Sequence, residues 1–160
     1  VCSSDLADVP GGAFAGDGPS EWMGWRRRFL TLLDQQIHLE RMVRIVGKDS
    51  LPPRQQLTLF CAELVNEVFL RQSAFSEVDW NASPQRQATM MRLLGRFIAR
   101  AEQALAHGVA LDRVTGIPVL RELHRMGEDI REGDSAAFEA LMERLEDEIR
   151  KLEPEAERGC

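Results

Sequence analysis

The chain of 160 residues is long enough for one ordinary domain with tails, and its balance of 44% hydrophobic and 29% charged residues is that of a soluble globular protein. A formal net charge of -6 argues against a phosphate-backbone binder, so we expect no nucleic-acid partner. No apolar run approaches the roughly 18–20 residues that span a bilayer, so we expect no direct membrane insertion.

The two ends of the chain are predicted to lie outside the folded domain. Residues 1–6, VCSSDL, correspond to one translation frame of a common sequencing adaptor, so we expect an artefact there and a fragment whose upstream sequence is missing. Residues 7–19 are rich in Gly, Pro and Ala, which is typical of a linker. A helical domain is therefore expected over residues 20–152, followed by a tail over 153–160.

From Ser20 onward, apolar residues recur at three- and four-residue steps, which predicts a long amphipathic helix. Ser20 is the expected N-cap, and Gly47 the expected left-handed C-terminal cap. The predicted buried face comprises Trp22, Trp25, Phe29, Leu32, Leu33, Ile37, Val43 and Val46.

A second helix is predicted after the turn KDSLPP, with Ser50 as a candidate cap and proline tolerated in the first turn. Its expected apolar face comprises Leu57, Phe60, Cys61, Leu64, Val65, Val68 and Phe69.

The third helix is expected to begin with Ser83 as its cap and Pro84 at its first position, and to stop at Gly108. Its apolar face comprises Met90, Leu94, Phe97, Ile98, Ala101 and Leu105.

Further helical segments follow from Leu111 and from Pro118, and Asp134 is expected to cap the last helix. That helix presents apolar residues at near-heptad spacing: Phe138, Leu141, Met142, Leu145, Ile149 and Leu152. Short links and the lack of any alternating strand pattern predict an all-α fold, a helical bundle of about five helices.

Motifs for catalysis or metal binding do not emerge from the residues alone. VGKDS at 46–50 resembles the end of a phosphate-binding loop, but Met42 replaces the first glycine, Asp49 replaces the hydroxyl, and the motif ends a helix. The three cysteines have no metal or redox spacing and are expected to be reduced thiols of a cytosolic protein. We therefore predict neither a catalytic residue nor a metal site.

Two charged surfaces have alternative interpretations. Arg92, Arg96 and Arg100 form a basic stripe, which is either solvated and paired with carboxylates of a neighbouring helix or receives a phosphate or an acidic partner. The last helix is either solvated or faces a partner; its charged residues are Glu139, Glu143, Arg144, Glu146, Asp147, Glu148, Arg150 and Lys151.

The segment FLRQSAFSEVDW, residues 69–80, places Phe75 and Trp80 where a helical pattern stops. One interpretation is that Phe75 fills the core between the second and third helices. The other is that its ring stacks on a planar ligand such as a nucleotide base, an interaction that contributes about 1–3 kcal/mol.

Several motifs occur in a distinctive order along residues 17–127. They are Val46-Gly47, Leu51-Pro52, RQQLTL at 54–59, FLRQSAF at 69–75, Gly108-Val109, Leu111-Asp112, Ile117-Pro118-Val119, Arg121-Glu122 and Arg125-Met126. This ordered set resembles the C-terminal helical domain of the catalytic A (alpha) subunit of V/A-type rotary ATPases.

The resemblance implies that a preceding nucleotide-binding domain supplies the P-loop, the magnesium site and the catalytic carboxylates, so this chain alone is expected to be inactive. It implies that Ser73, Ala74 and Phe75 border the adenine of ATP or ADP, with Phe75 as the stacking ring. Departures from the family pattern include Ser73 in place of Asn and Arg86-Gln87 in place of Lys-Gln. Whether Trp80 faces the nucleotide or the core is open.

The same resemblance implies the B subunit and the central-stalk subunits as partners, in the cytoplasmic head of an assembly peripheral to the membrane. Tilting of the domain would couple ATP hydrolysis or synthesis to stalk rotation and ion transport. The alternative is a non-catalytic helical interaction or regulatory bundle that dimerises through its last helix.

Overall fold

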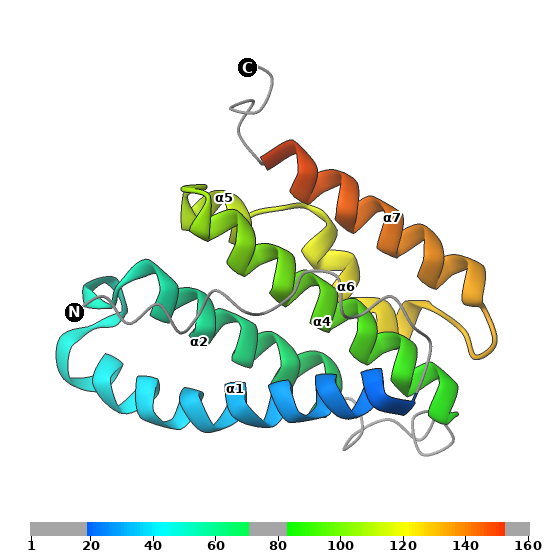
Figure 1. Cartoon of the computed structure of the whole chain (residues 1–160), viewed down its shortest axis with the longest axis horizontal. Coiled ribbons are helices and arrows are strands. Elements are labelled where there is room, and N and C mark those ends of the chain that lie inside the picture. Colours follow the sequence, from blue (N-terminus) through cyan, green and yellow to red (C-terminus); the bar gives the residue numbers. More distant parts are fainter. Residues whose placement is uncertain (1–18, 71–82, 153–160) are drawn as a thin grey trace.

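The computed structural model describes residues 19–70 and 83–152, with side chains from 23 to 68 and from 83 to 152. Throughout these ranges the regular elements are helical and no strand occurs, which confirms the all-α prediction (Figure 1). The elements are α1 (Pro19–Val46), the 3₁₀ turn η1 (Lys48–Ser50), α2 (Pro53–Val65), the π-helix η2 (Asn66–Leu70), α4 (Pro84–Ala106), α5 (Leu111–Thr115), α6 (Val119–Asp129) and α7 (Ser135–Leu152).

Helix α4 is the centre of the bundle. It packs against the α1–α2 hairpin on one side and against α5, α6 and α7 on the other (Figure 1). Six of its residues are fully buried, namely Leu93, Leu94, Phe97, Ile98, Ala101 and Ala104. The Phe97 ring meets Phe60 of α2 edge-on, with centroids 6.3 Å apart. The predicted apolar face of α4 is therefore confirmed, and burial of this surface stabilises the fold.

Close approach of α1 to α4 depends on one glycine. A Cβ at position 95 would lie 2.2 Å from Cε3 of Trp25, whose side chain is 4% exposed. The Trp25 ring therefore packs directly on the backbone of α4, where any larger residue would displace it.

Three predicted helix ends are confirmed. Ser83 accepts a hydrogen bond from the Arg86 amide at 3.2 Å, and Asp134 accepts one from the Ala137 amide at 3.1 Å. After α4, Gly108 has φ +87°, and its amide and that of Val109 bond to carbonyls of the last helical turn. This pair of bonds is a Schellman motif, which requires a residue that tolerates positive φ.

Three other predicted ends are wrong in detail. Ser20 is the second residue of α1, which begins at Pro19. Pro52 precedes α2, while the Ser50 hydroxyl donates to the Val46 carbonyl at the end of α1, at 2.7 Å, and does not cap α2. Gly47 has the expected positive φ of 84°, but its ψ of 154° lies outside the left-handed helical region. Gly47 directly precedes the η1 turn.

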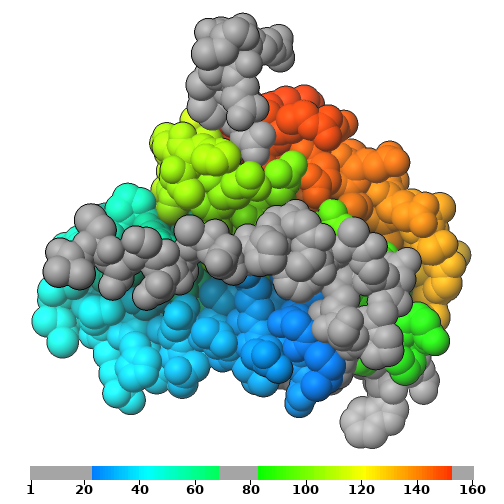
Figure 2. Space-filling view, viewed as in Figure 1, coloured from blue at the N-terminus to red at the C-terminus, as the bar shows by residue number. Residues whose placement is uncertain are grey.

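The buried face of α1 is only partly as predicted. Trp25, Phe29 and Leu32 are buried, but Ile37 and Val46 are each 53% exposed. Leu39 is buried in their place, in a small separate cluster with residues of η1–α2. In Figure 2, α1 forms one long edge of the molecule. Its large exposed apolar residues are Met23, Leu30, Ile37, Met42, Ile45 and Val46.

Candidate functional site

The residues predicted to border adenine, Ser73, Ala74 and Phe75, lie outside the described residues, as does Trp80. The site is therefore built from the two helical segments on either side of residues 71–82. The first is η2, which extends α2, and the second is the first turn of α4.

The entering segment, η2, is a π-helix over Asn66–Leu70, and such turns inside α-helices occur frequently at functional sites. Val68 is fully buried and holds η2 to the core. Glu67 lies on the outer side, where its Oε2 is 3.5 Å from Nδ1 of His124 in α6. The chain therefore enters residues 71–82 from a segment that contacts α6.

The exit segment is held by Arg86, whose side chain is 6% exposed. Its Nη1 donates to the Ile130 carbonyl at 2.7 Å, and its Nη2 donates to the Gly127 carbonyl at 2.6 Å. Gly127 lies in the last turn of α6 and Ile130 directly follows the helix. At this end a helix has no internal donors left for its carbonyls, and its dipole favours a cation. The guanidinium also lies 6.0 Å from the ring centroid of Phe138 in α7.

Helix α6 thus contacts both flanks of residues 71–82, η2 through His124 and α4 through its carboxyl end. In the sequence, Arg86 stands out only as a departure from a Lys-Gln pair. No local pattern identifies its partners, because they lie 41 and 44 residues further along the chain.

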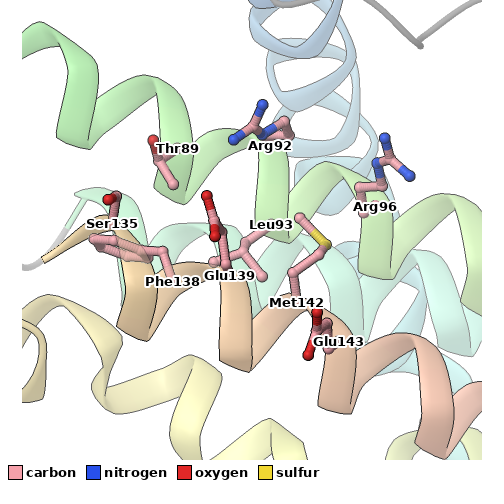
Figure 3. A pocket seen from close by; sticks show the side chains of 9 residues that line it. All are labelled: Thr89, Arg92, Leu93, Arg96, Ser135, Phe138, Glu139, Met142 and Glu143. Carbon is pink, nitrogen blue, oxygen red and sulfur yellow. The ribbon is translucent and has the colours of Figure 1, made fainter.

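A groove with a volume of 350 Å³ lies between α4 and α7 (Figure 3). Its lining residues are Thr89, Arg92, Leu93, Arg96, Ser135, Phe138, Glu139, Met142 and Glu143. Figure 3 shows arginines on the α4 wall and carboxylates on the α7 wall. The two walls therefore carry opposite charges. Phe138 lines this groove and also lies against the Arg86 guanidinium, so the groove adjoins the contacts of Arg86.

The interpretation of the basic stripe as paired with a neighbouring helix is confirmed for two of its members. Arg100 Nε donates to Glu146 Oε2 at 3.1 Å, and Arg96 Nη1 lies 3.8 Å from Glu146 Oε1. These contacts join α4 to α7, and the two positive charges are paired with a carboxylate of the same chain.

The interpretation of the last helix as solvated holds for Glu139 and Glu143, which are exposed, but not for all of its carboxylates. Glu148 Oε2 accepts a hydrogen bond from the Val119 amide at 2.9 Å and so caps the start of α6. Glu122 of α6 pairs with Arg144 through both carboxylate oxygens. Helix α7 therefore fixes α6, the helix on which both flanks of residues 71–82 rest.

Within residues 19–70 and 83–152 no group of three or more His, Cys, Asp or Glu side chains is arranged to hold a metal ion. Cys61 is 1% exposed, and burial, followed by the negative charge of Glu102, raises the pKa of its thiol above the ordinary value while Arg28 lowers it. The described helices include none that is long and apolar enough to cross a membrane.

The fold and the site define an all-helical domain in which residues 71–82, between a π-helix and a central helix, are the candidate functional segment. Residues 12–115 match the C-terminal domain of V and A type ATP synthase, and the chain belongs to this family. The match includes residues 71–82 and the two segments that flank them, whereas α6 and α7 follow it in the chain.

Among its relatives, the chain is 36% identical to the A subunit of the A-type ATP synthase of Pyrococcus abyssi over 132 residues, which are 82% of this chain and 13% of that protein. It is 40% identical to the A subunit of the A-type ATP synthase of Thermococcus onnurineus over 66% of this chain and 18% of that protein. It is 34% identical to the A subunit numbered 3 of the A-type ATP synthase of Methanospirillum hungatei, over 84% of this chain and 23% of that protein. The chain spans less than a quarter of the length of these relatives.

Proposed function

We propose that this chain is the C-terminal helical domain of the catalytic A subunit of a V/A-type ATPase or ATP synthase, and that Ser73, Ala74 and Phe75 border the adenine of bound ATP or ADP. The observation that carries the proposal is that the family match over residues 12–115 contains this segment together with both of its flanks. Relatives that are A subunits of A-type ATP synthases support the same assignment.

In this proposal a preceding nucleotide-binding domain holds the phosphates and Mg²⁺ and supplies the catalytic carboxylates. The contribution of this chain is to position the base. The Phe75 ring stacks on adenine, while the flanking helices set the position of residues 71–82 relative to the nucleotide.

Coupling to rotation requires a contact with other subunits, and the end of α1 offers one. Met42, Ile45 and Val46 are 39%, 84% and 53% exposed and lie next to the η1 turn. Large apolar residues gathered at one helix end are typical of a protein-binding surface. We assign this end of α1 to the central stalk, with the B subunit as the neighbouring partner in the soluble head of the assembly.

Substitution of Phe75 tests the adenine contact in the complete subunit. Phe75→Ala is expected to weaken MgATP binding about 5- to 150-fold, because loss of base stacking costs about 1–3 kcal/mol. Phe75→Trp, which retains a stacking ring, is the matched control and should bind MgATP within a few-fold of the unmodified protein. Equilibrium titration with MgATP measures both. Unchanged affinity of a normally folded Phe75→Ala variant would remove Phe75 from the pocket.

The alternative of a free-standing regulatory bundle is not favoured by the family match. The two proposals differ in the gene: the uninterrupted reading frame should continue upstream into a P-loop domain only if the chain is part of a catalytic subunit. Recovery of an authentic upstream region without such a domain would refute the proposed function.

A further inference from the structure

We infer that Arg86 is a positioning residue for adenine nucleotide binding: by capping the carboxyl end of α6, it fixes the point at which the chain leaves residues 71–82 and enters α4. The inference rests on the proposed function, because that function places the adenine contact within residues 71–82. It goes beyond that function by assigning a role to a side chain outside the adenine pocket.

The first step is the burial of Arg86. A buried cation is costly unless it is well paired, and here both terminal nitrogens are hydrogen-bonded at 2.7 and 2.6 Å. Glu132 Oε2 lies 3.9 Å from Nε, which adds a compensating charge. Arg86 is the third residue of α4, so these contacts fix the first turn of that helix against α6.

The second step concerns the other flank. His124, which pairs with Glu67 of η2, and Gly127, which accepts from Arg86, are three residues apart in α6. Residues three apart share one face of a helix and are separated by about 4.5 Å along its axis. Side chains on both flanks of residues 71–82 therefore contact neighbouring residues of a single helix, which itself is held by α7.

The third step is the chemistry of the guanidinium. Its planar fork reaches two carbonyls at once, whereas a lysine ammonium at the same position would keep the charge but act as a point donor. Arg86→Lys is therefore expected to keep part of the positioning, and Arg86→Met, which is similar in length but uncharged, to lose it.

Steady-state ATP hydrolysis compares both variants in the full-length protein, with the thermal unfolding temperature recorded for each. For Arg86→Met we expect the KM for MgATP to rise about threefold to tenfold, by more than kcat falls, with Arg86→Lys lying between it and the unmodified protein. Arg28→Met is the matched control, because its pair with Glu102 also joins two helices but involves neither α6 nor η2, and Glu102 lies sixteen residues beyond Arg86 on α4. It should leave the KM unchanged.

Glu67→Gln provides a second test, because the Glu67 side chain is 51% exposed and its replacement should not endanger folding. It is also expected to raise the KM. If Arg86→Met does not fold, Arg86→Lys provides the test at Arg86 itself. The inference is overturned if Phe75→Ala raises the KM while a folded variant of Arg86 does not, or if Arg28→Met raises it equally. If Phe75→Ala itself has no effect, the proposed function fails and the inference falls with it.

Discussion

At the scale of single residues, the contact between Gly95 and Trp25 makes the sharpest prediction about stability. Gly95→Ala should destabilise the domain by about 1–3 kcal/mol, although alanine favours helices, because the added Cβ would lie 2.2 Å from a ring carbon of Trp25. Urea unfolding of the two proteins, followed by far-ultraviolet circular dichroism, measures the difference.

The same change in a Trp25→Leu background separates the clash from other effects of the alanine. Removal of the indole leaves room for the Cβ, so the penalty of Gly95→Ala should shrink or reverse in that background. An equal penalty with and without Trp25 would show that the ring is not the cause.

The buried thiol of Cys61 predicts a dependence of stability on pH. Burial raises the pKa of this thiol in the folded state, whereas in the unfolded chain it ionises near 9.0. Above that pH the unfolded chain binds fewer protons than the folded one, so the free energy of unfolding should fall as pH rises, with a limiting slope of about 1.4 kcal/mol per pH unit.

Cys61→Ala removes this dependence and serves as the reference. Unfolding free energies of both proteins under reducing conditions, at pH 7, 9 and 10, give the comparison, since all other titrating groups are common to the two chains. If the unfolding free energies of the two proteins changed with pH in parallel, the Cys61 thiol would not be the source of the pH dependence.

Local chemistry explains which single residues the sequence can identify. Ser83 and Asp134 are predicted as caps and are caps, because a cap and its amide partner lie three residues apart. The contacts of Arg86, Gly95 and Glu148 are not predictable in this way, because their partners are distant in the sequence and follow only from the packing of whole helices.

At the scale of elements, a single glycine after α4 allows the backbone conformation that ends the helix. Gly108 has φ +87°, and no atom lies within 4 Å of the position of a Cβ. Gly108→Ala should therefore cost about 1 kcal/mol through backbone strain alone. Gly108→Asn should cost less, because asparagine tolerates this conformation. Urea unfolding of both variants tests the order; equal losses would show that side-chain polarity is irrelevant there.

Helix α1 shows the limit of periodicity at this scale. A three- and four-residue pattern groups residues on one face but does not tell which part of that face another helix covers. Trp25, Phe29 and Leu32 lie against α2 and α4, whereas Ile37 and Val46 lie where the described part of the chain provides no cover. The all-α class and the faces of α4 and α7 are predictable because neighbours surround those helices.

At the scale of the whole molecule, the candidate site divides into a part that motifs predict and a part that only folding reveals. FLRQSAF and the Ser83-Pro84 start of α4 are recognisable in order along the chain, and the family match includes both. The common support of the two flanks by α6 requires the three-dimensional arrangement, since α6 follows them by more than thirty residues in sequence.

The exposed end of α1 gives the prediction that concerns the assembly. Ile45 is 84% exposed, and a large apolar side chain at the centre of an interface typically contributes more than 1 kcal/mol to binding. Ile45→Ser should weaken binding of the full-length protein to the central-stalk subunits by about tenfold, because about 1.4 kcal/mol corresponds to this factor. Surface plasmon resonance with immobilised stalk subunits is a suitable measurement.

Met23→Ser is the matched control for this experiment. Met23 lies on the same helix and is 51% exposed, but it is about 33 Å along the helix axis from Ile45 at 1.5 Å per residue. Because both changes replace an exposed apolar side chain with serine, they should affect folding and solubility alike, and only Ile45→Ser should weaken stalk binding. Equal binding by both variants would place the stalk contact elsewhere on the domain, while leaving the adenine contact at Phe75 to be judged by its own titration.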